Sequence, residues 1–97
     1  MDNFKIVSIS CSTRYRDEII NLYNKLTCEG CIVLADLTDH DKQDEFDKEM
    51  VDRMHLKKID MAEDIYFLVK DNHMGESVTK EFEYAKSKNK NIKIISF

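Results

Sequence analysis

Four short runs of hydrophobic residues are spread along this chain, and each is rich in β-branched side chains. The runs are Phe4–Ser10, Cys31–Ala35, Ile65–Val69 and Asn91–Phe97. Runs of this length and composition are typical of strands that are buried on both faces. The pattern therefore predicts four strands of a parallel sheet that has helices on both faces.

Between these runs, hydrophobic residues recur every three to four positions, which is the period of an amphipathic helix. The first helix should end at Gly30, and the third should follow a loop from Asp71 to Ser77. The middle pattern runs from Lys42 to Glu63. It would be roughly 30 Å long at 1.5 Å per residue, so we expect a kink or break near its start. The positions that define the three helices are Tyr15, Ile19, Leu22, Tyr23 and Leu26; Phe46, Met50, Val51, Met54, His55, Ile59 and Ala62; and Val78, Phe82 and Ala85.

Strands and helices alternate in the order β-α-β-α-β-α-β, and we expect residues 1–97 to form one domain. Regular alternation with short connections predicts a three-layer, flavodoxin-like α/β fold. Right-handed crossovers with the first strand in the centre give a four-stranded parallel sheet of order 2-1-3-4. Ligands bind such sheets at the carboxyl ends of the strands, where the strand order reverses. The loops Ser10–Arg14 and Asp71–Ser77 should therefore enclose the site.

Three glutamates near the third helix differ in their predicted exposure. Glu76 lies at the helix start, where a carboxylate suits the helix dipole. A helical wheel turns Glu83 about 140° away from the hydrophobic face and Glu81 only about 60° away, at the border of the core. A half-shielded carboxylate at this place suits a catalytic acid, base or nucleophile. The alternative is a boundary glutamate that pairs with Lys80 or Lys88.

Three segments carry a resemblance to a known family. They are "GESVTKEFEYA", which contains Glu81 and Ala85, "SCSTR", which contains Ser12 and Arg14, and "MHLKKIDMAEDIYFLV". In this order they resemble the nucleoside 2-deoxyribosyltransferase-like superfamily, which includes the 2′-deoxynucleoside 5′-phosphate N-hydrolases. The resemblance covers nearly the whole chain.

The resemblance implies an activity and a set of site residues. It implies cleavage or transfer at the N-glycosidic bond of a 2′-deoxynucleoside or its 5′-monophosphate, with Glu81 as the nucleophile. It implies a homodimer and neither a metal nor an organic cofactor. A helix N-terminus at the first loop would favour the anionic end of the ligand. The substrate-binding residues that follow are Ser12, Thr13, Arg14, Gly75 and Ser77.

The chain departs from the family pattern at two positions. The family has an aspartate upstream of the third strand, and this place falls at or beside His55, with Asp52 and Asp60 one turn away on either side. The resemblance thus makes His55 the second catalytic candidate, whereas its place on the hydrophobic stripe leaves a core histidine as the alternative. Cys11 stands where the family favours a glycine.

The composition of the chain limits the kinds of partner that we expect it to bind. A net charge of −4 argues against a nucleic-acid polymer, and no hydrophobic run approaches the ~20 residues of a membrane span. Three cysteines and no recognisable signal peptide indicate a reducing cytoplasm. Asp39, His40 and Asp41 could meet a metal ion, but a solvated loop is the alternative.

Two functions stay open at the level of sequence. The first is a glycosidic-bond enzyme that uses Glu81, and the second is a non-catalytic module that binds a nucleotide or a nucleotide-derived signal in the same cleft. A small interaction domain with a vestigial cleft is a third hypothesis. Two glycines in the whole chain exclude a G-x-G-x-x-G dinucleotide loop.

Overall fold

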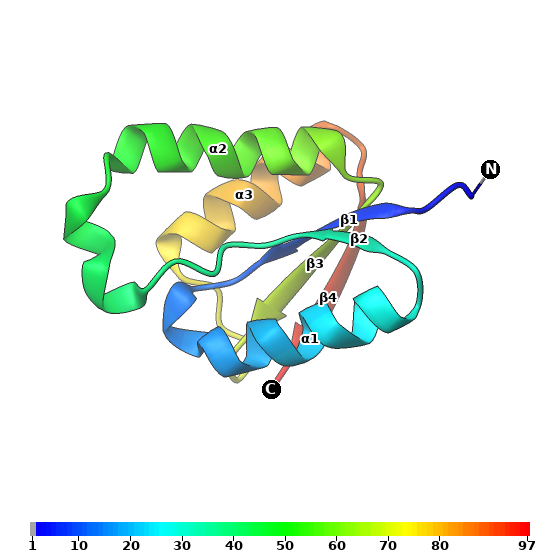
Figure 1. Cartoon of the computed structure of the whole chain (residues 1–97). Coiled ribbons are helices and arrows are strands. Elements are labelled where there is room, and N and C mark those ends of the chain that lie inside the picture. Colours follow the sequence, from blue (N-terminus) through cyan, green and yellow to red (C-terminus); the bar gives the residue numbers. More distant parts are fainter. Residues whose placement is uncertain (1) are drawn as a thin grey trace.

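A computed structural model describes residues 2–97 and confirms the predicted architecture. Four parallel strands form one sheet of order β2-β1-β3-β4 (Figure 1). Their bounds are β1 Ile6–Ser10, β2 Ile32–Leu34, β3 Asp64–Val69 and β4 Asn91–Ser96. The fold is therefore a three-layer, flavodoxin-like α/β fold, as the alternation of elements predicts.

The helices lie on both faces of the sheet (Figure 1). Helix α1, Arg16–Cys28, covers one face, whereas α2, Lys48–Met61, and α3, Glu76–Ser87, lie together on the other. Two short 3-10 helices, η1 Thr13–Tyr15 and η2 His40–Glu45, precede α1 and α2. Within residues 2–97, no helix is both long and apolar enough to cross a membrane.

The core consists of two hydrophobic clusters, one on each face of the sheet. Successive residues of a strand point to opposite faces, so β3 supplies both clusters, whereas the buried hydrophobic residues of β1, Val7 and Ile9, lie in the cluster beside α1. Phe67 of β3 is fully buried and meets the ring of Phe82 edge-on, with 5.3 Å between centroids. The buried members are Val7, Ile9, Ile19, Leu22, Leu26 and Leu68 beside α1, and Ile59, Ala62, Ile65, Phe67, Val78 and Ala85 beside α2 and α3.

The break predicted near the start of the middle helix is present. The chain forms η2, becomes extended at Phe46 and only then enters α2. Asp47 caps α2, because its carboxylate accepts a hydrogen bond from the backbone N–H of Met50 at 3.3 Å. The regular helix is therefore shorter than the Lys42–Glu63 pattern that predicted it.

Not every hydrophobic position of the predicted middle helix belongs to the core. Phe46, Met50 and Met54 belong to the helical pattern, yet they are 38%, 46% and 50% exposed. The stripe of α2 that faces the sheet instead contains Ile59, which is 1% exposed. Two hydrophobic rows run along this helix, and only one of them can meet the sheet.

The outer strands are less buried than their sequence suggests. Ile32 of β2 is 48% exposed and Ile94 of β4 is 54% exposed, although both lie in hydrophobic runs. Each of these strands has a neighbour on one side only. The outer side of each edge strand has no neighbouring strand, so the edges of the sheet remain partly open.

A compensated carboxylate lies at the amino end of the sheet. Asp64, whose side chain is 5% exposed, accepts hydrogen bonds from Lys5 Nζ at 3.2 Å and Asn91 Nδ2 at 2.9 Å. Lys93 Nζ is 3.8 Å away. Burial would raise the pKa of Asp64, but the hydrogen bonds from Asn91 and Lys5 outweigh this effect and hold the pKa below its usual value. This cluster is structural and lies far from the carboxyl ends of the strands.

We expect Asp64→Ala to lower the free energy of unfolding by about 1–2 kcal/mol, because it leaves an amide and two cations without their acceptor. An aspartate with a depressed pKa stabilises the fold above its unfolded pKa, and this contribution is lost as the pH falls through the folded pKa. The difference between the two proteins, measured by urea denaturation, should therefore shrink below about pH 4. A difference that is constant between pH 7 and pH 3 would contradict this role.

Candidate functional site

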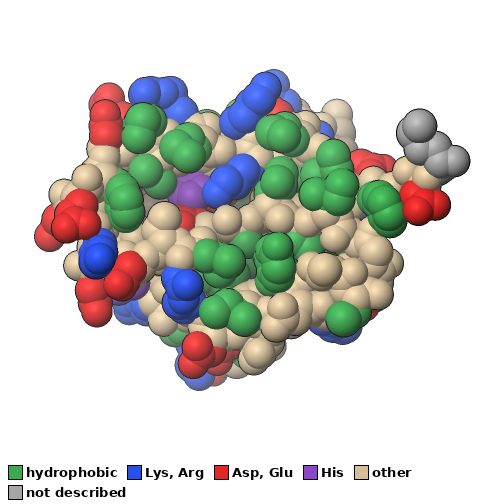
Figure 2. Space-filling model, in the orientation of Figure 1, with side chains coloured by type: hydrophobic (Ala, Val, Ile, Leu, Met, Phe, Trp, Pro, Cys, Tyr) green, Lys and Arg blue, Asp and Glu red, His purple; other side chains and the backbone are tan. Residues whose placement is uncertain are grey.

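A cavity of about 580 Å³ opens at the carboxyl ends of β1 and β3, where the fold predicts a site. Its walls come from the loop after β1, the loop after β2, η2, α2 and the start of α3. In Figure 2 a histidine ring and an acidic group are visible between hydrophobic side chains, below the position of α2. The cavity therefore combines titratable groups from segments that are far apart in sequence.

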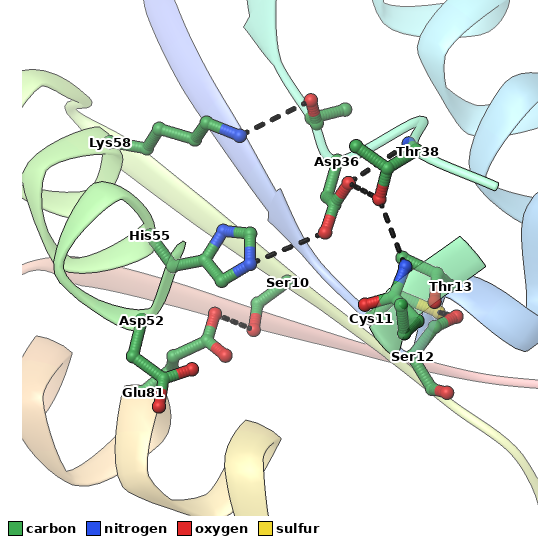
Figure 3. Close-up of polar contacts among 12 residues, drawn as sticks. Ser10, Cys11, Ser12, Thr13, Asp36, Thr38, Asp52, His55, Lys58 and Glu81 are labelled. Carbon is green, nitrogen blue, oxygen red and sulfur yellow. Dashed lines mark hydrogen bonds and ion pairs between the residues drawn. The ribbon is translucent and has the colours of Figure 1, made fainter. Parts of the chain in front are cut away.

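Glu81 projects from α3 into this cavity and is held by β1 (Figure 3). The hydroxyl of Ser10, a buried residue at the end of β1, donates a hydrogen bond of 2.8 Å to Glu81 Oε1. The alternative pairing with a lysine is wrong: Lys80 pairs with Glu76 at 3.6 Å, and Lys88 lies over the ring of Tyr84. A serine hydroxyl is thus the partner of this carboxylate.

The surroundings of Glu81 disfavour its charge. Burial raises the pKa of Glu81 above its usual value, although the hydrogen bond from Ser10 and the charge of His55 act in the opposite direction. The carboxylates of Asp52 and Asp36 add to the rise. A carboxylate whose charge is poorly compensated is more basic and more nucleophilic than a solvated one, which is common at catalytic sites.

His55 lies on the wall of the same cavity and pairs with Asp36 (Figure 3). The distance between His55 Nε2 and Asp36 Oδ2 is 3.3 Å, and the two side chains are 19% and 13% exposed. The alternative of a core histidine is therefore only half right: one ring nitrogen has a protein partner, but the ring lines the cavity. The structure brings His55 and Glu81, the two catalytic candidates, into one pocket.

Asp36 is the centre of a small hydrogen-bonded group. Its Oδ1 accepts bonds from the backbone N–H of Thr38 at 3.0 Å and from the Thr38 hydroxyl at 2.6 Å, while Oδ2 faces His55. Burial would raise the pKa of Asp36, but the bonds from His55 and Thr38 outweigh it, so the pKa lies well below the usual range. Asp36 is therefore ionised at neutral pH.

Asp36 and Ser10 are site residues that the sequence did not single out. Asp36 directly follows the second hydrophobic run, and Ser10 ends the first one. Their positions at the carboxyl ends of strands were the available signal, because side chains there meet at one edge of a parallel sheet. Asp60, one turn beyond His55, lies elsewhere and accepts a hydrogen bond from the Tyr84 hydroxyl at 2.7 Å.

The first loop contributes to two cavities. Ser12 and Thr13 line the cavity of Glu81, whereas Arg14 lines a second cavity of about 420 Å³. The expected helix N-terminus at this loop is absent, because η1 intervenes and α1 begins only at Arg16. Thr13 Oγ1 lies 2.8 Å from His40 Nδ1, and this hydrogen bond joins the loop to η2.

Gly75 and Ser77 lie at the start of α3 and line the cavity of Glu81, as predicted. Gly75 is the N-cap of α3 and gives the helix no side-chain cap, so backbone N–H groups of the first turn remain available. Ser12, Gly75 and Val78 line both cavities. The two cavities are therefore neighbours that share one rim.

Cys11, in the loop after β1, has an unreactive thiol. Burial, and then the charges of Glu18 and Glu81, raise the pKa of its thiol to about 12. The thiol therefore stays protonated at neutral pH and is a poor nucleophile.

Among residues 2–97, no three His, Cys, Asp or Glu side chains lie close enough together to hold a metal ion. The loop from Asp39 to Asp41 therefore lacks the ligand set that a metal site needs.

Comparison with known proteins adds nothing to this geometry: no protein-family model matches the chain, and no curated protein matches it significantly. The fold and the pocket define the class of protein at a coarser level. It is a three-layer, flavodoxin-like α/β protein with a shielded carboxylate at the point where the strand order reverses.

Glu81→Gln should leave the fold as stable or make it more stable. A carboxylate with a raised folded pKa destabilises the fold above its unfolded pKa, and an amide can still accept the Ser10 hydrogen bond. We expect a gain of at most about 1 kcal/mol at pH 7, measured by urea denaturation, and no gain below about pH 4, where the glutamate is protonated in both states. Glu83→Gln, at an exposed position of the same helix, is the control and should change nothing. A marked loss of stability in the Glu81 variant would mean that this carboxylate is structural.

Proposed function

We propose that this protein cleaves or transfers the N-glycosidic bond of a 2′-deoxynucleoside or its 5′-monophosphate, with Glu81 as the nucleophile. The observation that carries the proposal is the hydrogen bond from Ser10 to Glu81 inside the cavity at the carboxyl ends of β1 and β3. It fixes one carboxylate oxygen, so Oε2 is the oxygen available for attack. The family resemblance of the segment around Glu81 supplies the kind of bond.

The proposed reaction has two steps. Glu81 Oε2 forms a bond to the anomeric carbon while the carbon–nitrogen bond breaks. The electron pair of the broken bond leaves with the base, which takes up a proton. Water, or the nitrogen of a second base, then attacks the same carbon and releases the glutamate. Carboxylates suit this chemistry because the transition state resembles an oxocarbenium ion.

Asp36 and His55 support the same step. Asp36 is ionised and lines the cavity, so its negative charge would stabilise the positive sugar ring. His55 and Thr38 hold this carboxylate in place. We therefore propose that Asp36, held by His55, takes the place of the aspartate that the resembled family has upstream of the third strand.

The charge of the cavity suits an uncharged sugar and base. Three carboxylates in addition to those of Asp36 and Glu81 line it, namely Asp44, Asp52 and Glu76, and Lys48 is the one lysine among its lining residues. Carboxylates accept hydrogen bonds from hydroxyl and amino groups, and they repel phosphate. The anionic end of a nucleotide would therefore point away from this cavity.

One observation favours a non-catalytic nucleotide-binding module instead. The Nε2 atom of His55 is engaged by Asp36 at 3.3 Å, so it is not free to protonate a leaving base. Release of base from the four common deoxynucleosides and their monophosphates, followed by chromatography, separates the two functions. We also propose a cytoplasmic location, from the unpaired cysteines, and a homodimer, from the family resemblance.

Glu81→Gln should lower the rate of base release by roughly a thousandfold or more, because a neutral amide cannot form the ester. In the wild-type protein the rate should fall at acidic pH, with a midpoint above the usual glutamate pKa, since burial raises the pKa of Glu81. Chromatography of the released base at several pH values measures both effects. Glu83→Gln should keep full activity, and a Glu81→Gln protein with substantial turnover would remove Glu81 from the mechanism.

Arg14→Ala should weaken binding of a deoxynucleoside 5′-monophosphate by roughly tenfold and leave binding of the free nucleoside unchanged. Arg14 lines the second cavity, which shares a rim with the cavity of Glu81, and its guanidinium would face the phosphate. Isothermal titration calorimetry on the Glu81→Gln background measures binding without turnover. Equal losses for nucleotide and nucleoside would show that Arg14 does not contact phosphate.

A further inference from the structure

The second cavity has a chemical character opposite to that of the first. Arg14 and Lys70 supply positive charge, His73 adds an imidazole, and Asp71 is the single carboxylate among the lining residues. The cavity lies at the end of β3, between η1 and the loop before α3. An acidic cavity and a basic cavity thus lie side by side across a shared rim.

A tight turn places two of these groups next to each other. Asp71 and Asn72 have positive φ angles of 49° and 61°, and the backbone N–H of His73 donates to the carbonyl of Lys70 at 2.9 Å. Lys70 and His73 form an antiparallel bridge pair, so their side chains lie on the same side of the turn. Two positive φ angles at the centre are typical of a type I′ turn, which favours Asp and Asn.

The turn is anchored to the last strand. The backbone N–H groups of Asp71 and Asn72 donate to the Phe97 carbonyl at 2.9 Å and to the Ser96 hydroxyl at 2.8 Å. Lys70 Nζ lies 5.4 Å from the centroid of the Phe97 ring. The backbone of the turn that carries Lys70 and His73 is therefore held in place before any ligand arrives, which lowers the entropic cost of binding.

The order of the groups along the two cavities suggests what the basic one binds. Glu81 lies in the first cavity, the uncapped start of α3 at Gly75 lies at the rim, and the Lys70–His73 pair lies beyond it. A sugar beside Glu81 would put its 5′-phosphate at the rim, near helix N–H groups that favour anions. The pair beyond the rim would then face the next group of the ligand.

We propose that the basic cavity is a subsite for a second phosphate, so that the site takes nucleoside 5′-diphosphates or other pyrophosphate-bearing nucleotides in preference to monophosphates. Lys70 and His73 contact the distal phosphate from one side, and Arg14 contacts the bridge between the two phosphates from the other. The identity of the sugar rests on the proposed function, whereas the recognition of pyrophosphate rests on this cavity alone.

Inorganic pyrophosphate and inorganic phosphate are the probes, and isothermal titration calorimetry measures their affinities for the whole chain. We expect pyrophosphate to bind more tightly than phosphate, and Lys70→Met to weaken pyrophosphate binding by roughly tenfold, because it removes one charge-assisted contact and keeps the side-chain stem. Lys88→Met is the matched control: Lys88 also lies 5.4 Å from an aromatic centroid, that of Tyr84, but at the far end of α3. It should leave the affinity unchanged.

A second variant, which should strengthen pyrophosphate binding, tests whether a loss of affinity in the first variant is due to misfolding. Asp71→Asn removes the one opposing charge and keeps a residue type that tolerates a positive φ, so pyrophosphate should bind several-fold more tightly. Equal affinities for the two probes, no binding of either, or the same effect from the Lys70 and Lys88 variants would overturn the subsite. Base release is not involved, so intact pyrophosphate binding in a protein that releases no base would reject the proposed reaction alone.

Discussion

The burial of β1 and β3 on both faces is the constraint on which the rest of the molecule depends. Val7 and Ile65 are fully buried, and they point to opposite faces of the sheet. Two buried faces need helices on both sides, and parallel strands need crossovers to provide them. The same arrangement brings the carboxyl ends of both strands to one edge of the sheet. Burial of the core therefore also positions Ser10, at the end of β1, next to Glu81 of α3.

Buried carboxylates at the two ends of the sheet differ in how far neighbouring groups compensate their charge. At the amino end, Asp64 is surrounded by cations and an amide, and its charge stabilises the fold. At the carboxyl end, Glu81 has one hydroxyl as its hydrogen-bond donor and other carboxylates nearby. An uncompensated charge is costly, and stability alone does not explain it. This contrast is the physical reason to regard the carboxyl end as the functional one.

The strands and the place of Glu81 could be predicted from the sequence, because both depend on local periodicity. The exposure of Met50 and Met54 could not be, because α2 carries two hydrophobic rows and periodicity does not say which one meets the sheet. The pairing of Asp36 with His55 could not be predicted from the sequence either. The two residues are 19 positions apart, and their contact depends on how the loop after β2 returns towards α2.

The open edge at β4 has a consequence for association between chains. An exposed strand presents unpaired backbone groups that can template pairing with another molecule, and an uninterrupted run of isoleucines increases the hazard. In β4 the run of Ile92, Ile94 and Ile95 is interrupted by Lys93, whose ammonium group is near Asp64. A lysine on an edge strand is a common protection against such pairing. One side chain therefore helps to neutralise a buried acid and also protects the sheet against edge-to-edge aggregation.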